Sequence, residues 1–295
     1  MRHAPYAVPV LVHLNGEILP ADRARVGVFD RGFLMGDGIY EGLRAFDGRV
    51  VRMDLHVRRM NHGLKSCRIA WDAARLDGLT RDLLKANGLR DAFIYWQVTR
   101  GVPAPGQPVR SRVLGGEMTP TVFGYCVPAA PLSEYDHDRV PTKSAITTPD
   151  TRWHRGTVKS ISLLGSVLGA IEGAEAGADD AIFVRDGVVA EGTAANLIAV
   201  IDRAGTPEIV TPSLESAPIL AGVTRDILLE RRLGIVERAL GVDELDRASE
   251  VMLLGTLTMV TSIVRLNGRV VGNGAAGSVA KRLLRELCLA IKEAP

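Results

Sequence analysis

The chain has 295 residues, of which 46% are hydrophobic and 24% are charged, so it can bury two domain cores or one large core. Its net charge of +2 gives no reason to expect nucleic acid or an anionic membrane as a partner. No apolar run approaches the roughly 18 residues that a membrane span needs, and residues 1–10 lack the apolar segment of a secretory signal. The three cysteines are isolated and form no metal-ligand pattern. We therefore expect a cytoplasmic protein without a bound metal.

The first part of the chain alternates short strands, tight turns and helices. Turns are predicted at Asn15-Gly16 and Asp47-Gly48, because Asx-Gly pairs favour the primed turns of β-hairpins. Asp54 suits the N-cap of a helix, and Gly88 suits the end of the next one. The Pro- and Gly-rich loop 101–116 is long enough to suggest a functional role. The elements expected here are strands at 10–14, 17–19, 44–46, 50–53, 93–99 and 122–127, and helices at 54–64 and 80–87.

A linker with two prolines and no periodicity follows at 128–139. We place the domain boundary there, which gives a small N-terminal α/β domain at 1–127 and a large C-terminal α/β domain at 140–295. Mixed strands and helices in both parts predict an α/β (α+β) fold with two domains that meet at a cleft. The elements expected in the second domain are helices at 160–176, 222–233 and 278–291, a hairpin around Asp186-Gly187, and strands at 250–254 and 263–266.

Lys159 differs from the five other lysines of the chain. Those lie in charged helical patterns, in a polar stretch or in the tail, whereas Lys159 precedes the apolar residues Ile161, Leu163 and Leu164. Desolvation by such neighbours disfavours the ammonium form and leaves a neutral amine, which is the nucleophile that a Schiff base with an aldehyde requires. The alternative is a lysine that snorkels to water at the start of a helix.

Glu191 follows the apolar run 188–190 and ends a predicted strand. By itself, it suits an edge-strand carboxylate in water. Together with Lys159 it has a sharper interpretation, because pyridoxal phosphate needs an amine for its aldehyde and a carboxylate that keeps its pyridine nitrogen protonated.

Three parts of the chain are candidates for holding a phosphate. Gly222 precedes Val223 and Thr224 at the start of a predicted helix, where N–H groups and the helix dipole attract an anion. Gly255-Thr256 ends a strand in a turn that carries a hydroxyl, and Arg59 offers a charge-assisted contact. Each of these features alone is more often structural.

Together, these residues resemble the fold-type IV, or class IV, pyridoxal-phosphate aminotransferases over about residues 15–284. This family includes D-amino acid and branched-chain aminotransferases, R-selective amine transaminases and 4-amino-4-deoxychorismate lyases. The resemblance implies an active site in the interdomain cleft, and a homodimer in which the neighbouring subunit supplies part of each substrate pocket. The motifs that carry it are FDRGFLMGDGIYEGLR (29–44), HVRR (56–59), VKSISLL (158–164), EGTAAN (191–196), LAGVTR (220–225) and GT (255–256).

The resemblance also implies roles for individual residues. Lys159 is similar to the lysine that forms the Schiff base and shuttles a proton from the substrate Cα, and Glu191 is similar to the partner of the pyridine nitrogen. Leu220 matches the residue packed on the cofactor ring, and Tyr40 and Arg44 match positions near the substrate. The remaining cofactor-binding positions are Arg59, Val223, Thr224, Gly255 and Thr256 at the phosphate, and Thr193 and Asn196 near the cofactor.

The segments 94–101 and 152–168 are most similar to D-amino acid aminotransferases. In those enzymes an Arg-x-His pair in the following loop, donated across the dimer, clamps the substrate α-carboxylate. Pro105 and Gln107 occupy these positions here, so the usual clamp is absent. Arg44 is one candidate replacement, in a segment similar to branched-chain enzymes, and its alternative role is structural. Other candidates are Arg110, Arg112, Arg152 and Arg155.

We therefore predict a transaminase that transfers the amino group of a D-amino acid to a 2-oxo acid such as 2-oxoglutarate or pyruvate, with pyridoxal 5′-phosphate as cofactor. The main alternative is a branched-chain L-amino acid aminotransferase. The R-selective amine transaminases differ strongly at 36–40, and the lyase uses the same lysine and cofactor to eliminate pyruvate. A non-catalytic pyridoxal-phosphate-binding scaffold would need neither Lys159 nor Glu191.

Overall fold

The computed structural model describes residues 11–113, 116 and 118–293, so position 10 of the first predicted strand lies outside the described residues. Contacts divide the chain into two compact units, residues 1–131 with 158–162, and residues 132–157 with 163–295. The division after residue 131 falls within the predicted linker, whereas the segment around Lys159 groups with the first unit and not with the second half of the chain, where we expected it. Both units mix strands and helices, which confirms the predicted α/β (α+β) class.

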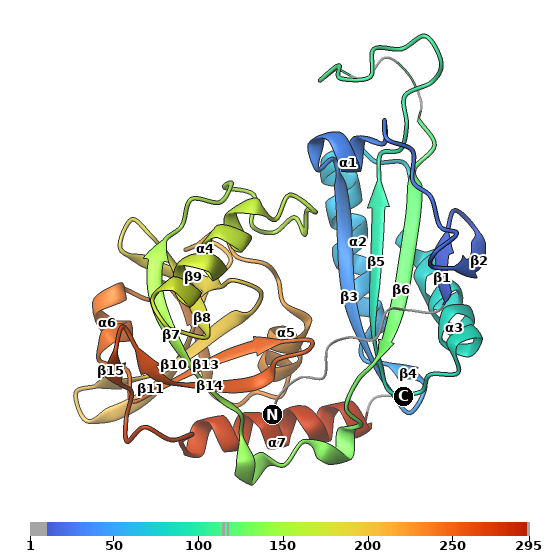
Figure 1. Cartoon of the computed structure of the whole chain (residues 1–295). Helices are drawn as coiled ribbons and strands as arrows, with labels where there is room; N and C mark the ends of the chain where they lie inside the picture. The colour runs from blue at the N-terminus through green and yellow to red at the C-terminus, as the bar shows by residue number, and fades with distance from the viewer. Residues whose placement is uncertain (1–10, 114–115, 117, 294–295) are drawn as a thin grey trace. The chain divides into compact units, whose positions relative to one another are not determined.

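The first unit is built on an antiparallel sheet of six strands in the order β2-β1-β6-β5-β3-β4 (Figure 1). Three helices accompany the sheet. The strands are β1 (Leu11–Leu14), β2 (Glu17–Pro20), β3 (Gly38–Phe46), β4 (Arg49–Val50), β5 (Ala92–Thr99) and β6 (Thr121–Pro128). The helices are α1 (Arg31–Met35), α2 (Met53–Cys67) and α3 (Leu76–Asn87), with a 3-10 turn at Ala73–Arg75.

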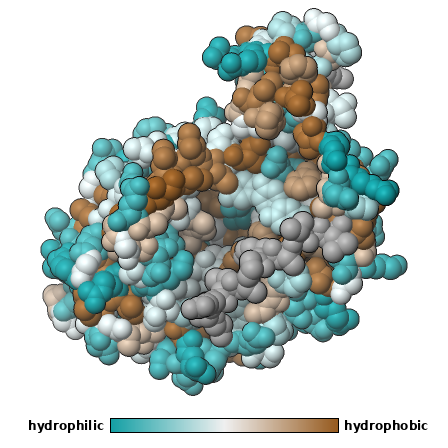
Figure 2. Space-filling model, viewed as in Figure 1, coloured by the Kyte–Doolittle hydropathy of each residue, from teal (hydrophilic) through white to brown (hydrophobic). Residues whose placement is uncertain are grey.

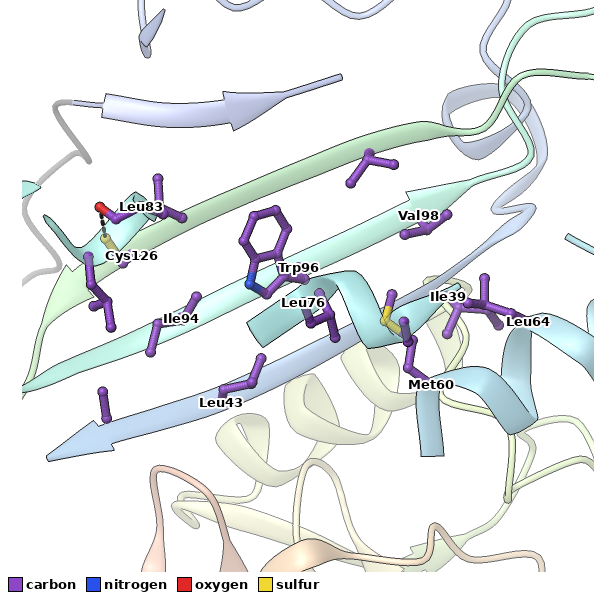
Figure 3. Packing of buried hydrophobic residues seen from close by; sticks show 14 of the residues in the cluster. Ile39, Leu43, Met60, Leu64, Leu76, Leu83, Ile94, Trp96, Val98 and Cys126 are labelled. Atoms are coloured by element: carbon purple, nitrogen blue, oxygen red, sulfur yellow. Dashed lines mark hydrogen bonds between the residues drawn. The ribbon is translucent and has the colours of Figure 1, made fainter. Parts of the chain in front are cut away.

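One face of this sheet is closed by α2 and α3 over a continuous apolar core. Ile39, Leu43 and Trp96 alternate along β3 and β5 toward the helices, where Met60 and Leu64 of α2 meet them (Figure 3). Because successive strand residues point to opposite faces, Tyr40 of β3 and Tyr95 and Gln97 of β5 lie on the other face, where they are only partly buried. The sheet therefore has a closed apolar face and a face with partly accessible aromatic side chains.

Local turn and cap signals are confirmed with one exception. Asn15 and Asp47 have φ values of 51°, as the predicted hairpin turns require, and Gly88 ends α3 in the left-handed conformation. Asp54 was expected as the N-cap of α2, and this is wrong, because the helix begins at Met53 after a left-handed Arg52. Asp54 lies instead in the first turn, where its carboxylate favours the positive end of the helix dipole and accepts from Arg52.

The second unit contains a nine-stranded mixed sheet in the order β12-β11-β10-β13-β14-β7-β8-β9, with β15 paired to β14. Its strands are β7 (Thr142–Pro149), β8 (Asp180–Arg185), β9 (Val188–Gly192), β10 (Asn196–Arg203), β11 (Thr206–Pro212), β12 (Ile235–Arg238), β13 (Glu250–Gly255), β14 (Met259–Leu266) and β15 (Arg269–Val270). Its helices are α4 (Leu164–Glu175), α5 (Val223–Glu230), α6 (Val242–Asp246) and α7 (Ser278–Glu293), with 3-10 turns at Leu132–Glu134 and His137–Arg139. In the described part of the chain, no helix is both long and apolar enough to span a membrane.

The helix after Lys159 begins later than predicted. We expected it at residue 160, but α4 starts at Leu164, and residues 158–162 are extended or irregular. Leu164 is 70% exposed and Val167 49%, so these residues form an exposed face of α4, over which Figure 2 shows apolar surface. The prediction of a helix that starts directly after Lys159 is wrong.

Candidate active site

Lys159 is held in the first unit because its segment pairs with the start of β3. The N–H of Tyr40 donates to the carbonyl of Lys159 at 3.0 Å, and the N–H of Ile161 donates to the carbonyl of Gly38 at 3.1 Å. These two bonds make residues 158–162 a short antiparallel extension of the sheet. The backbone of the lysine is thereby fixed to a central element of the unit.

A close approach at Gly36 completes this attachment. The hydroxyl of Ser162 donates to the carbonyl of Gly36 at 3.0 Å. Gly36 has a φ of +64°, and a Cβ there would lie 2.4 Å from the Oγ of Ser162. Glycine is needed at this position both for its backbone conformation and for the space that it leaves.

The side chain of Lys159 lies on the aromatic face of the first unit's sheet. Its Nζ is 4.3 Å from the centre of the Tyr40 ring, which attracts an ammonium group through its π face. Tyr40 stacks on Tyr95 with 5.6 Å between ring centres, and Tyr95 stacks on Tyr125 at 5.2 Å. Burial raises the pKa of Tyr95, so its hydroxyl stays protonated and donates to Gln97 at 2.9 Å. The amine thus lies at one end of a row of aromatic rings.

Arg59 is oriented by a buried carboxylate that the sequence motifs did not single out. Glu41 is fully buried on β3 and accepts from Nε of Arg59 at 2.8 Å and from Nη2 at 2.7 Å. Nδ1 of His56 lies 2.8 Å from the same carboxylate. Burial by itself raises the pKa of Glu41, but Arg59 and His56 lower it to about 2. The bidentate pair fixes the plane of the guanidinium, as recognition of a phosphate requires.

In the second unit, Glu191 lies at the end of β9 and is 6% exposed. Its carboxylate accepts from Nη1 of Arg152 at 2.8 Å, from Nδ2 of Asn196 at 3.0 Å and from the N–H of Leu220 at 3.2 Å. Asn196 also donates to the carbonyl of Leu220 at 2.9 Å. Three donors from three parts of the unit hold the carboxylate in one position, which suits a group that must face a pyridine nitrogen.

Two of the arginines considered as substrate clamps already have structural partners. Arg152 binds Asp150 at 2.9 Å as well as Glu191, and its guanidinium lies 4.2 Å from the centre of the Phe183 ring. Burial by itself lowers the pKa of Arg152, but these two carboxylates raise it above its usual value. Arg44 is 2% exposed, donates to the carbonyl of residue 130 and lies over the ring of residue 46. The other three candidates, Arg110, Arg112 and Arg155, are exposed.

The predicted phosphate-binding positions of the second unit gather around Asn196. Val223 and Thr224 begin α5 and are buried, and their N–H groups belong to the first turn, which has no partners within the helix. A Cβ on Gly222 would lie 1.8 Å from Oδ1 of Asn196, so the start of α5 approaches this side chain closely. Asn196 also pairs with Leu254 near the end of β13, the strand that ends at Gly255 just before Thr256.

One predicted cofactor-binding side chain has another partner. The hydroxyl of Thr193 donates to Asp180 at 2.7 Å, within the second unit. The backbone N–H of Thr193 donates to the same oxygen at 3.4 Å, so both contacts join the end of β9 to the start of β8.

The residues present fit pyridoxal phosphate by their chemistry. The first unit offers the amine of Lys159, the aromatic ring of Tyr40 and an oriented guanidinium at Arg59. The second unit offers a fixed carboxylate at Glu191 and the N–H groups at the start of α5. These are the donor types that an aldehyde, a pyridine nitrogen and a phosphate each need.

Comparison with known proteins identifies the family. A profile described as amino-transferase class IV matches residues 38–266. A putative branched-chain-amino-acid aminotransferase of Methanocaldococcus jannaschii is 34% identical over 279 residues, which cover 92% of this chain and 93% of that protein. A D-alanine aminotransferase of Bacillus licheniformis is 33% identical over 278 residues, which cover 92% and 94%.

A solved structure agrees with this result. The branched-chain amino acid aminotransferase of Thermobaculum terrenum in its PLP form superposes with a TM-score of 0.81 at 25% identity, covering 97% of this chain and 95% of that chain. The profile spans most of this chain, and two relatives exceed 30% identity over nearly its whole length. The chain therefore belongs to the class IV aminotransferases.

Proposed function

We propose that this aminotransferase transfers the amino group of a D-amino acid to a 2-oxo acid such as 2-oxoglutarate or pyruvate. The observation that carries its chemistry is the placement of Lys159 on the aromatic face beside Tyr40. The D-amino acid assignment is supported by the similarity of residues 94–101 and 152–168 to D-amino acid aminotransferases, and by the relative from Bacillus licheniformis. A branched-chain L-amino acid aminotransferase is the second candidate, favoured by the relative from Methanocaldococcus jannaschii.

Pyridoxal 5′-phosphate is the cofactor, and when bound it withdraws electrons from the substrate Cα, so that the Cα proton becomes acidic. Lys159 would hold the cofactor covalently through Nζ. With the cofactor and substrate bound, this amine would take the proton from the substrate Cα as general base and later return it as general acid. Tyr40 orients this amine through its ring.

The other site residues bind and orient. Arg59 is the phosphate-binding guanidinium, kept in its plane by Glu41. Val223 and Thr224 offer backbone N–H groups to the same phosphate, with Gly255 and Thr256 beside them. Further site residues are Glu191 at the pyridine nitrogen, Leu220 against the ring, and Thr193 and Asn196 near the cofactor.

A homodimer is part of this proposal, with a small-molecule amino acid and 2-oxo acid as partners. Large apolar side chains in and near α1 are exposed, including Val28 at 66%, Phe29 at 51% and Phe33 at 75%. Val113 in the loop after β5 is 79% exposed. Exposed apolar groups of this size mark a surface that another protein covers, and a second copy of this chain fits the family. The free thiols of Cys67, Cys126 and Cys288 support a location in the cytoplasm.

Single-turnover spectroscopy of the cofactor-loaded protein tests the proposal. The protein is mixed separately with D-alanine, D-glutamate, L-leucine and R-1-phenylethylamine, and conversion of the yellow form to the pyridoxamine form is followed. Conversion with D-amino acids alone supports the proposal. Conversion with L-leucine moves the chain to the branched-chain group, and conversion with the amine alone indicates a substrate without a carboxylate. If none of the four converts the protein, the lyase reaction becomes the next candidate.

A further inference from the structure

Asp37, between α1 and β3, joins two arginines of the first unit through one carboxylate. Its Oδ2 accepts from Nε of Arg31 at 2.7 Å and from Nε of Arg100 at 2.8 Å, and its Oδ1 accepts from Nη2 of Arg100 at 2.9 Å. The three side chains are only 17%, 6% and 12% exposed, in the order Asp37, Arg31 and Arg100. Burial by itself raises the pKa of Asp37, but the two arginines lower it. The carboxylate is therefore the shared counter-charge of two largely buried guanidinium groups.

The first arm of this cluster is Arg31, which connects Asp37 to the loop between β5 and β6. Nη1 of Arg31 donates to the carbonyl of Ser111 at 2.7 Å, and its backbone N–H donates to the carbonyl of Gly101 at 2.9 Å. Gly101 has a φ of +91°, and a Cβ there would lie 1.9 Å from the carbonyl oxygen of Thr119. The loop is thus held at its base by close backbone contact and at its far part by a buried guanidinium.

The neighbouring Asp30 fixes both stems of the same loop. Its Oδ2 accepts from the hydroxyl of Thr99 at 3.0 Å and from the hydroxyl of Thr121 at 2.6 Å, so the end of β5 and the start of β6 share one carboxylate. With the stems held in this way, the contact between Arg31 and Ser111 ties the described far part of the loop to α1.

The second arm is Arg100, which connects Asp37 to the C-terminal end of α2. Nη2 of Arg100 donates to the carbonyl of Cys67 at 2.7 Å, and Nη1 donates to the carbonyl of Arg68 at 2.7 Å. These carbonyls are among those that a helix leaves without partners within itself. Because α2 also carries Arg59, the second arm helps to set the position of the helix that holds the phosphate-binding candidate.

Asp37 itself lies between two residues that hold the lysine segment. Gly36 accepts from Ser162, and Gly38 accepts from the N–H of Ile161. One carboxylate therefore connects the backbone that carries Lys159, the end of α2 and the loop after β5. All of these contacts lie within the first unit.

We propose that Asp37 is a positioning residue for transamination, which holds the Lys159 segment, the end of α2 and the loop 101–113 in one arrangement through Arg31 and Arg100. It acts through these elements and contacts no reacting atom. The connection to turnover rests on the proposed function, whereas the connection to the loop can be tested without it.

The test compares Asp37→Asn with Asp47→Asn in the cofactor-loaded protein. Asp47 is a matched control, because it also binds an arginine, Arg90, in the first unit, but both side chains are more than 70% exposed. Two quantities are measured, the rate at which trypsin cuts after Arg110 and Arg112, and kcat and KM for the amino donor that the wild type uses. We expect Asp37→Asn to speed cleavage about tenfold and to lower kcat/KM about tenfold, through both kcat and KM, and Asp47→Asn to change neither.

Arg31→Lys separates the two arms, because a single ammonium cannot hold Asp37 and the carbonyl of Ser111 as a guanidinium does. We expect faster cleavage and a higher KM with kcat close to the wild-type value. This variant also carries the test if Asp37→Asn does not fold.

The proposal is overturned if these variants match Asp47→Asn, or if cleavage accelerates while kcat and KM stay unchanged. If the wild type converts L-leucine instead of D-amino acids, the proposed function fails, and the same comparison is made with L-leucine. If it converts no amino donor, the positioning role is overturned together with the proposed function, and the cleavage rates report on the loop anchor alone.

Discussion

The two units hold their functional charges by opposite arrangements. In the first unit, the fully buried carboxylate of Glu41 fixes the guanidinium of Arg59. In the second unit, the guanidinium of Arg152 fixes the carboxylate of Glu191. In each unit, a predicted cofactor-binding charge is therefore oriented by a partner of opposite charge. These partners, Glu41 and Arg152, were not among the predicted cofactor-binding residues. The comparison shows that the orientation of a site residue depends on a partner with a different chemical role.

Replacing the amine itself is expected to have the largest effect. Lys159→Ala removes the group that we propose to bind the cofactor and to move the proton, so turnover should fall by roughly 10²–10⁴-fold or more. The yellow absorbance of the loaded protein should be lost as well. Lys85→Ala on the exposed side of α3 is the control and should behave like the wild type. Full turnover in Lys159→Ala would refute the assignment of this lysine.

Breaking the buried pair in the first unit should mainly cost stability. Glu41→Gln keeps the shape but leaves Arg59 without its buried counter-charge, which costs about 3–5 kcal/mol of the free energy of unfolding for pairs of this kind. Affinity for the phosphate of the cofactor should fall too, because the guanidinium loses its fixed plane. Urea unfolding and cofactor titration measure the two effects, with the exposed Glu17→Gln as control. A variant as stable as the wild type would show that this pair is not needed to hold α2.

The same pair predicts a dependence of stability on pH. The folded pKa of Glu41, about 2, lies below its ordinary value of 4.5. The unfolded chain therefore binds this proton more readily, and the stabilisation is complete above about pH 4.5 and is lost as the pH falls toward 2. Unfolding measured across this range should show a smaller loss of stability in Glu41→Gln than in the wild type. If the free energy of unfolding fell equally with pH in both proteins, the lowered pKa assigned to Glu41 would be contradicted.

The corresponding change in the second unit should affect activity more than stability. In Glu191→Gln the amide would no longer fill the proposed role of keeping a pyridine nitrogen protonated, and we expect kcat to fall about a hundredfold, which corresponds to about 2.7 kcal/mol. Arg152 still has Asp150 as its counter-charge, so unfolding should change less than in Glu41→Gln. Steady-state kinetics and urea unfolding measure kcat and the free energy of unfolding for Glu191→Gln and Glu41→Gln. A larger loss of stability in Glu191→Gln would reverse the comparison.

The smallest effect on substrate use is expected at Arg44. This arginine is buried against Phe46 and the carbonyl of residue 130, which favours the structural role over the substrate clamp. Arg44→Met should therefore leave KM for the amino donor near the wild-type value. An increase of KM by about tenfold, with folding intact, would instead fit the loss of a charge-assisted contact to the substrate carboxylate.

Features that depend on neighbouring residues were predictable from the sequence. The hairpin turns at Asn15-Gly16 and Asp47-Gly48 and the helix end at Gly88 were found where expected, because a positive φ strongly restricts which residues fit. The mixed fold class and the family also followed, because six ordered motifs extend along nearly the whole chain. Lys159 and Glu191 were singled out because their chemistry is unusual within apolar runs.

The tertiary structure alone decided what surrounds those two residues. Periodicity favoured a helix from residue 160, but pairing with β3 extends residues 158–162 and places Lys159 over Tyr40, which is more than a hundred residues away in sequence. The pairing of Glu41 with Arg59 could not be predicted from the sequence. Alternation along a strand indicates which face a side chain occupies, but not which residue of another element it contacts there. Local propensity acts over a few residues, whereas strand pairing and buried ion pairs join distant parts of the chain. The sequence therefore determined which chemical groups this protein carries, and the fold decided how each of them is held.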